Sequence, residues 1–306
     1  MVQESAEKAG QPAMSDFVAT KEQTAFQRVI SSQPFWVTIA LIALVILMTA
    51  MEPSFGTSEN VANVTRNLAP FGIMALGMTV AGIPVLTWDS DLLPENKDLR
   101  VAYIGTHNYE IGTNLAKLAM QIKPKGGTIC IQSGGAAAAN HNERMQGIRD
   151  TLSGTKSAAS PGDRLTGQNG WTEIEGCPLY TDDDFPRSVQ QFEDIMAKNP
   201  NLDAFIPTGG FPQFIPDANR AAVAPYKEKI ASKALALVVA DTLPVQIDQM
   251  NEGFSLGQVG QRPFEMGYKT MMALKDMKDG KAPPADPTYT GLDICTPETA
   301  DTCIAK

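Results

Sequence analysis

Polar side chains follow several apolar runs that have the composition of buried strands. Asp89 follows the run IPVLTW, Asp241 follows ALALVVA, and Gln261 follows FSLGQVG. Arg144 lies after the run GTICIQ and a loop of small residues. Carboxylate, amide and guanidinium groups form planar, paired hydrogen bonds. If these four side chains meet at one edge of a sheet, the neighbouring hydroxyl groups of a sugar ring are a suitable ligand.

Two further residues beside Asp89 could complete such a site. Trp88 precedes Asp89, Ser90 follows it, and a second tryptophan, Trp171, lies later in the chain. An indole ring offers a flat apolar face against which the C–H side of a sugar ring can pack. We therefore expect Trp88 and Ser90 in the site and consider Trp171 for a second ring face.

Each of these residues also has an ordinary role. Asp89 and Asp241 could cap the turns or helices that follow them, and Arg144 could be a solvated residue on a helix surface. The two histidines, His107 and His141, lack the spacing of metal ligands. The sequence contains no GxSxG, HExxH, GxxxxGK[ST] or GxGxxG motif. It therefore predicts a protein that is not an enzyme and has no metal or cofactor.

From residue 82 onward, strand patterns alternate with helical patterns. The strand candidates are IPVLTW, LRVAYIG, GTICIQ, TEIEGCPLY, LDAFIPT, ALALVVA and FSLGQVG. Several are nearly continuous apolar runs, which are typical of parallel strands covered on both faces. The alternation predicts βαβ units in a doubly wound α/β sheet. In such sheets ligands bind beyond the carboxyl ends of the strands, where the polar residues above would lie.

Size and charge limit the possible functions. The chain has 306 residues, enough for one large domain or two ordinary ones. Its 25 Lys and Arg and 34 Asp and Glu give a formal charge of -9. A nucleic-acid-binding protein needs a basic face that displaces counterions from phosphates, so this balance argues against such a partner.

Residues 1–81 differ from the rest of the chain in their pattern of polar and apolar residues. Residues 1–34 are polar, whereas residues 35–51, FWVTIALIALVILMTAM, carry no charge and reach the lower limit for crossing a hydrocarbon core about 30 Å thick. A buried helix of a soluble domain is the alternative, but the run has no polar face. A second apolar stretch, residues 68–81, reaches spanning length only if it continues to about residue 87. In that case residues 83–87 could not form a strand.

The number of spans decides where the rest of the chain lies. With one span and Lys8, Lys21 and Arg28 held inside, the part after residue 82 lies outside the cytoplasm. With two spans, 35–51 and about 68–87, it lies in the cytoplasm and its cysteines stay reduced. We expect one span, that is, an N-terminal transmembrane helix.

The four cysteines are compatible with disulfides in an oxidising compartment. None of them forms a CxxC pair, which excludes zinc-ribbon and thioredoxin motifs. We expect a disulfide between Cys295 and Cys303, which close a short loop. Cys130 and Cys177 are the second candidate pair, with two buried free thiols as the alternative.

An ordered set of short motifs covers residues 82–306: GIPVLTWDSD, VAYIGTHNYEIG, NERMQGI, LVVAD and GQVGQRPFEMG. In these motifs the chain resembles the periplasmic sugar-binding proteins of ABC importers, of the ribose-binding type. The resemblance implies a type I periplasmic-binding-protein-like fold, in which two α/β lobes close around a sugar by hinge bending.

The same resemblance implies a role for each site residue. Asp89 matches the sugar-binding carboxylate of the first lobe, Arg144 the arginine of the second lobe, Asp241 the aspartate after a sheet strand, and Gln261 the glutamine at a lobe crossing. Two positions depart from the pattern: Ser90, where some members have arginine, and Gly209, where many have asparagine. The identity of the sugar therefore remains open.

The part from about residue 30 to residue 80 resembles the N-terminus of a ribose-type ABC sugar permease. The two resemblances meet near residues 80 and 81, which implies a permease cut after its opening segments and a binding protein without its first strand–helix units. The expected organisation has a polar segment (1–34), permease-like membrane segments (35–81) and a sugar-binding-protein-like region (82–306). Within that region a partial first lobe comprises 82–106 and 262–284, and a complete second lobe comprises 107–261 and 285–306.

The expected function is that of a component of an ABC-type sugar importer, which binds a monosaccharide and works with permease and ATPase subunits. The resemblance places it at the bacterial inner membrane, with the sugar-binding region in the periplasm. A partial first lobe is expected to weaken or abolish sugar binding, because a closing clamp needs both sides. The alternative is a non-functional fusion of permease and binding protein, or a permease fragment that binds no sugar.

Overall fold

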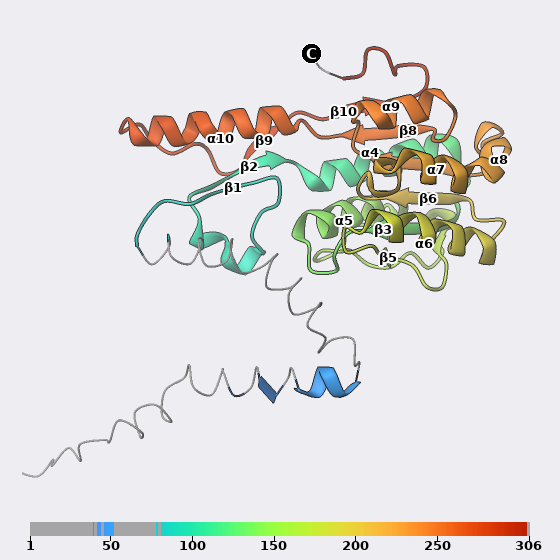
Figure 1. Ribbon diagram of the computed structural model, residues 1–306, viewed down its shortest axis with the longest axis horizontal. Coiled ribbons are helices and arrows are strands. Elements are labelled where there is room, and N and C mark those ends of the chain that lie inside the picture. The colour runs from blue at the N-terminus through green and yellow to red at the C-terminus, as the bar shows by residue number, and fades with distance from the viewer. Residues whose placement is uncertain (1–38, 40–41, 44–45, 52–77, 79–80, 305–306) are drawn as a thin grey trace, which may run out of the picture. The chain divides into compact units, whose positions relative to one another are not determined.

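The computed structural model describes residues 39, 42–43, 46–51, 78 and 81–304 (Figure 1). The chain divides into two units, Met1–Gly77 and Met78–Lys306. In the first unit, residues 39, 42–43 and 46–51 are helical. The remainder of the expected span 35–51 and nearly all of the apolar stretch 68–81 lie outside the described residues. Within the described part of the chain, no helix is long and apolar enough to cross a membrane.

A large, mostly parallel sheet forms the centre of the second unit. Its strand order is β10-β8-β7-β6-β3-β4, and β5 also pairs with β3. Only β10 is antiparallel to its neighbour. The strands are β3 (Gly127–Ser133), β4 (Trp171–Glu173), β5 (Leu179–Tyr180), β6 (Ala204–Pro207), β7 (Ala236–Ala240), β8 (Gly257–Gly260) and β10 (Asp293–Cys295).

Helices cover both faces of this sheet, because successive strand residues point to opposite sides. On β3, Ile129 and Ile131 pack in one core cluster with residues of α4 and α5, whereas Cys130 packs in the other cluster with residues of α6. The helices of this part are α4 (Asn108–Ile122), α5 (Ala139–Ser153), α6 (Phe185–Lys198), α7 (Pro216–Val223), α8 (Lys227–Ala231) and α9 (Pro244–Asn251), with short 3-10 turns at η3 (Gln168–Gly170), η4 (Phe211–Phe214) and η5 (Ala224–Tyr226). The apolar runs of the sequence are therefore strands buried on both faces.

Helices α4 and α5 pack with their backbones in contact. A Cβ atom at Gly112 of α4 would lie 1.9 Å from the carbonyl oxygen of Arg144 on α5, and one at Gly147 would lie 2.1 Å from that of Tyr109. No side chain larger than hydrogen fits at either position without moving a helix. The two glycines thus fix the position of α5 along α4.

A small parallel sheet has the order β1-β2-β9. Its strands are β1 (Leu86–Trp88), β2 (Ala102–Thr106) and β9 (Thr288–Thr290), with α10 (Pro263–Lys278) and the 3-10 turn η2 (Pro94–Leu99). Figure 1 shows these elements grouped together, with α10 beside β9 and β2. We call this group the small lobe, and the large sheet with its helices the large lobe.

The chain passes between the lobes at three crossings: from β2 into α4, from β8 into α10, and from β9 into β10 (Figure 1). The sequence-based boundary assigned all of 285–306 to the second lobe. The structure differs, because β9 pairs with β2 of the small lobe, and only from Asp293 does the tail join the large sheet. Strands of three residues, such as β9 and β10, carry too little pattern to be recognised in the sequence.

Two disulfides lie in the large lobe. Cys130 of β3 is bonded to Cys177 in the loop before β5, with their Cα atoms 5.4 Å apart. Cys295 of β10 is bonded to Cys303, with Cα atoms 5.2 Å apart. The second bond closes the C-terminal loop against Ile247 and Met250 of α9.

Candidate functional site

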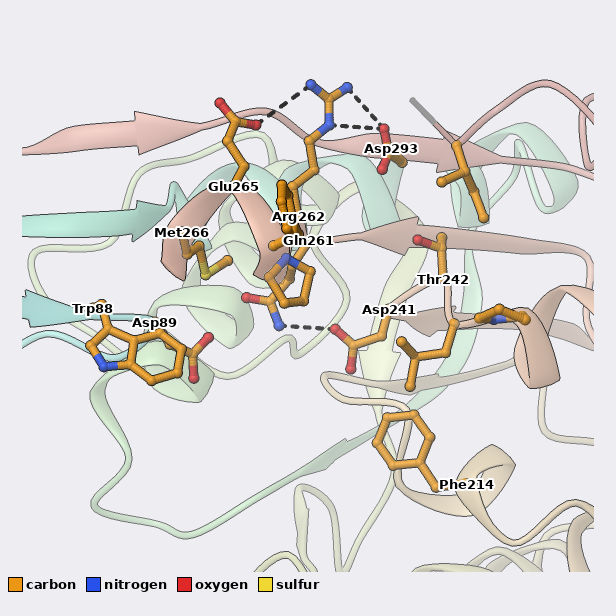
Figure 2. A pocket seen from close by; sticks show the side chains of 15 residues that line it. Trp88, Asp89, Phe214, Asp241, Thr242, Gln261, Arg262, Glu265, Met266 and Asp293 are labelled. Carbon is orange, nitrogen blue, oxygen red and sulfur yellow. Dashed lines mark hydrogen bonds and ion pairs between the residues drawn. The ribbon is translucent and has the colours of Figure 1, made fainter. Parts of the chain in front are cut away.

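A cavity of about 770 Å³ lies where the crossings meet, and residues from both lobes line it (Figure 2). Trp88 and Asp89 come from the end of β1 in the small lobe. Asp241 follows β7, and Gln261 follows β8, as the sequence predicted. The other lining residues are Phe214, Thr242, Leu243, Pro244, Arg262, Pro263, Phe264, Glu265, Met266, Asp293 and Ile304.

Asp241 is held by two hydrogen bonds at the wall of the cavity. Its Oδ2 accepts from the backbone N–H of Gly210 at 2.9 Å, and its Oδ1 accepts from Nε2 of Gln261 at 2.9 Å (Figure 2). The N-cap of the following helix is Leu243 rather than Asp241. The aspartate is therefore fixed by two partners from other strand ends and does not cap α9.

Gln261 links the first crossing to this aspartate. Its Oε1 accepts a hydrogen bond from Oγ1 of Thr106 at 3.1 Å, while its Nε2 donates to Asp241. Thr106 ends β2 and is buried. The amide oxygen is thus oriented by Thr106 of the first crossing, and the amide nitrogen by Asp241 after β7.

Arg144 is buried within the large lobe rather than solvated, with an exposed fraction of 1%. Its Nε donates to Oδ1 of Asn108 at 2.9 Å, and its Nη1 donates to the carbonyl oxygen of Thr208 at 2.8 Å. Its Nη2 is buried without a hydrogen-bond partner among the described residues. A buried N–H group without a partner is costly, and for a guanidinium it indicates an acceptor that a ligand can supply.

Asp89 presents its carboxylate from the small lobe. Its backbone lies in the left-handed region, with φ at 63°. No hydrogen bond or ion pair joins its carboxylate to another residue in the described part of the chain. Burial raises the pKa of Asp89, the charge of Arg144 lowers it in part, and the nearby charge of Asp241 raises it further. Asp89 is thus a half-buried acceptor close to both a cation and a second carboxylate.

A chain of hydrogen bonds connects Arg144 to the backbone of Asp89 across the first crossing. Arg144 donates to Asn108, whose Nδ2 donates to the hydroxyl of Tyr103 at 3.4 Å. That hydroxyl lies 2.8 Å from the carbonyl oxygen of Asp89 and 3.0 Å from that of Thr106. The N-cap of α4 is His107, so the Asn108 side chain does not cap the helix and can orient Arg144.

Two tryptophans and a serine were considered from the sequence. Trp88 is 55% exposed and lines the cavity. Ser90 is exposed and does not line it. Trp171 is 1% exposed and packs in the core beside Ile129 and Leu152, so it offers no face to a ligand. The idea of Trp171 as a ring face was wrong, because β4 brings it under the helices.

Sequence reasoning missed an aromatic wall and a buried histidine. Phe214 of η4 lines the cavity and meets Phe185 edge-on, with ring centroids 5.3 Å apart. Nδ1 of His141 lies 2.9 Å from Oγ1 of Thr208. Burial, together with the charge of Arg144, lowers the pKa of His141 to about 3, so its ring stays neutral at ordinary pH. The run FPQF after a strand and two glycines was the available signal for Phe214.

No cluster of three or more His, Cys, Asp or Glu side chains within the described ranges could hold a metal ion. The site is instead an arrangement of hydrogen-bonding groups with aromatic neighbours. Asp89, Asp241 and Gln261 line the cavity at the ends of parallel strands, as expected for a ligand site of a doubly wound sheet. Arg144 of α5 is not among the lining residues, but its charge is close enough to lower the pKa of Asp89.

Comparison with known proteins supports the same fold. Residues 78–282 match the family model described as periplasmic binding protein domain. No curated protein matches the chain. A solved ABC transporter solute binding protein from Burkholderia graminis, in complex with D-arabinose, is 26% identical with a TM-score of 0.61, and the alignment covers 77% of this chain and 73% of that chain.

Two more distant structures share the fold. GanP, a glucose-galactose binding protein from Geobacillus stearothermophilus, is 24% identical with a TM-score of 0.59, over 75% of this chain and 73% of that chain. A solute binding protein from Agrobacterium vitis with bound D-fucose is 19% identical with a TM-score of 0.63, over 74% of this chain and 71% of that chain. With the family match covering most of the chain, these findings establish that the protein belongs to the periplasmic binding protein family through its domain at residues 78–282.

Proposed function

We propose that the protein binds a monosaccharide in the cavity between its lobes, as the solute-binding component of an ABC-type sugar import system. The observation that carries the proposal is the proximity of two incompletely paired groups, the guanidinium of Arg144 and the carboxylate of Asp89. Among the described residues, neither the buried Nη2 of the guanidinium nor the nearby carboxylate of Asp89 has a hydrogen-bond partner. A sugar hydroxyl accepts from the first group and donates to the second, so one ligand satisfies both lobes.

The remaining contacts follow from the same geometry. Asp241 and Gln261 each keep acceptor capacity beyond their mutual hydrogen bond, which suits a second hydroxyl. The rings of Trp88 and Phe214 line the cavity and can cover the apolar C–H side of the sugar. Ser90 lies outside the cavity, and we assign it no contact.

The reported ligand of the Burkholderia graminis relative, D-arabinose, supports a monosaccharide as the substrate class. We propose a pentose or hexose of the kind taken by ribose-type importers. We also propose that the small lobe is reduced relative to a complete clamp. Its described sheet has only three strands, and Phe264 and Met271 of α10 are 86% and 66% exposed.

Titration calorimetry of the purified protein with a panel of pentoses and hexoses tests the proposal. We expect saturable binding of at least one sugar, with a Kd of about 10 μM to 1 mM because one side of the clamp is small. Sugar alcohols of similar size serve as controls. Absence of binding to every sugar would reject the proposal and favour the alternative of a permease and binding-protein fusion without sugar binding.

We further propose that residues 35–51 tether the protein to the bacterial inner membrane, with the cavity on the periplasmic side near the permease and ATPase subunits. The uncharged apolar run and the resemblance of residues 30–80 to a permease N-terminus support this proposal. After alkaline carbonate extraction of cells, the full chain should remain in the membrane pellet. Recovery of the chain in the extract would contradict the tether.

Sugar affinity should depend on pH through Asp89. The ionised carboxylate accepts the ligand hydroxyl, and burial raises the pKa of Asp89 above 3.8. Affinity should therefore fall about tenfold as the pH drops through this raised pKa, since protonation removes the charge that strengthens the hydrogen bond from the ligand hydroxyl. Asp89→Asn should bind weakly, with a flat profile over the same window. An unchanged wild-type affinity across that window would exclude Asp89 as an acceptor.

A further inference from the structure

The second crossing carries two adjacent side chains that reach the other two crossings. Gln261 accepts a hydrogen bond from Thr106 of the first crossing at 3.1 Å. The next residue, Arg262, reaches Asp293 of the third crossing. When two lobes move about a hinge, the backbone angles change at a few residues of the crossings. Gln261 and Arg262 lie at such a crossing.

Arg262 makes a multiple contact with the third crossing (Figure 2). Its Nε and Nη2 donate to Oδ1 of Asp293 at 3.1 and 2.9 Å, and its Nη2 also donates to the carbonyl oxygen of Leu292 at 3.4 Å. Its Nη1 lies 3.8 Å from Oε2 of Glu265. A guanidinium held at several points resists rotation better than a single ion pair, because its planar donors are fixed relative to each other.

The main chain of the third crossing is shaped to admit this guanidinium. A Cβ atom at Gly291 would lie 2.3 Å from Nη1 of Arg262. Asp293, whose exposed fraction is 4%, pairs in the large sheet with Gly260 of β8. The second and third crossings are therefore joined by strand pairing up to Gly260 and Asp293, and Arg262 extends that connection beyond the end of the sheet.

We propose that Arg262 and Asp293 form a hinge clasp that limits how far the two lobes can splay and thereby positions Gln261 in the cavity. Arg262 is a positioning residue in this scheme, because it acts on the ligand through Gln261 and the lobe angle. The inference about lobe angle does not depend on which ligand the cavity takes. Only its consequence for affinity depends on the proposed sugar binding.

Distance measurements between spin labels test the clasp directly. Labels are placed on the full chain at Lys278→Cys in α10 and Glu193→Cys in α6, which are exposed and lie in different lobes. The four native cysteines are in disulfides, so the two new thiols react selectively. Arg262→Gln should broaden the distribution of label distances, and Arg262→Lys should restore part of the wild-type width.

A matched control is available in the large lobe. Arg220 forms a two-point ion pair with Glu252, at 2.7 and 2.8 Å, that links α7 to the end of α9 and joins no crossings. Arg220→Gln should leave the distance distribution unchanged. The proposal is overturned if Arg262→Gln leaves the width unchanged or if both variants broaden it equally.

A second pair of variants protects the test against a folding defect. Asp293→Ala and the double variant Arg262→Gln/Asp293→Ala should show the same broadening as Arg262→Gln, since each removes the contact between Arg262 and Oδ1 of Asp293. Additive broadening would contradict a single shared contact. If a sugar binds, Arg262→Gln should also weaken it about tenfold. If no sugar binds even the wild type, the proposed function fails while the distances still decide the clasp.

Discussion

Replacing Gly112 with alanine is expected to lower the free energy of unfolding by about 3 kcal/mol or to prevent folding of the large lobe. A Cβ atom there would lie 1.9 Å from the carbonyl oxygen of Arg144 and 2.9 Å from the backbone nitrogen of Ile148. Both neighbours are backbone atoms of α5, so neither can rotate away. The two helices would have to separate, which would open the core around Leu115 and Met145.

This expected loss of stability is opposite in sign to the usual effect of a glycine-to-alanine substitution in a helix. Inside a helix, a change from glycine to alanine normally stabilises by about 0.5 to 1 kcal/mol, because alanine loses less backbone entropy. Gly267 in α10 has no atom of another described residue within 4 Å of its Cβ position, apart from the backbone of its own helix, and provides the matched control. Urea unfolding followed by circular dichroism should show Gly267→Ala stabilised and Gly112→Ala destabilised. Equal shifts for the two variants would contradict the close packing of α4 and α5.

The same contact has a functional consequence. Gly112 touches the backbone of Arg144, the residue whose guanidinium is directed by Asn108 of α4 and Thr208 after β6. A shift of α5 would therefore move Arg144 relative to both anchors. The close packing of α4 and α5 at Gly112 and Gly147 thus sets the position of the Arg144 side chain.

The strand ends of the site could be predicted from the sequence. Asp89, Asp241 and Gln261 follow nearly continuous apolar runs, and a parallel sheet brings the carboxyl ends of such runs to one edge. This inference needs only local pattern and one rule of topology. The prediction that these side chains meet at one edge of the sheet would hold even if Asp89 and Asp241 also capped turns or helices.

The partners of these residues could not be predicted in the same way. The burial of Arg144 depends on Asn108, 36 residues earlier, and Thr208, 64 residues later, and no local pattern links the three. Trp171 was misjudged for a related reason. Whether an aromatic residue at a strand lines a cavity or fills the core depends on which helices cover that strand, and only the tertiary fold decides this.

Replacing Arg144 with methionine is expected to reduce sugar affinity by about 100-fold or more while the protein still folds. Methionine has a similar length and no donor, so the hydrogen bond from Nη2 to the ligand is lost, and charged hydrogen bonds contribute about 1.5 to 3 kcal/mol. Loss of stability should be about 1 to 3 kcal/mol, because Asn108 and Thr208 lose their donor.

Arg149 supplies the matched control, since it is a second buried arginine on the same helix. Its Nε and Nη2 donate to both carboxylate oxygens of Glu173, at 2.7 and 2.8 Å, so that both donors are already paired, unlike Nη2 of Arg144. Arg149→Met leaves the buried Glu173 with only the longer contact to Nη1 of Arg164, at 3.5 Å, and the backbone N–H of Leu165, and should lower the free energy of unfolding by about 3 kcal/mol.

The two variants should therefore show opposite profiles when calorimetric titration is combined with denaturant unfolding. Arg144→Met loses affinity more than stability, and Arg149→Met loses stability while its folded fraction keeps the wild-type affinity. If Arg144→Met bound the sugar as tightly as the wild type, the unpaired Nη2 would not be a ligand donor. If Arg149→Met lost affinity to the same extent, the effect of Arg144 would reflect helix packing rather than contact with the ligand. Arg144 and Arg149 lie five positions apart on α5, so the comparison of their variants separates a loss of sugar affinity from a loss of stability within one helix.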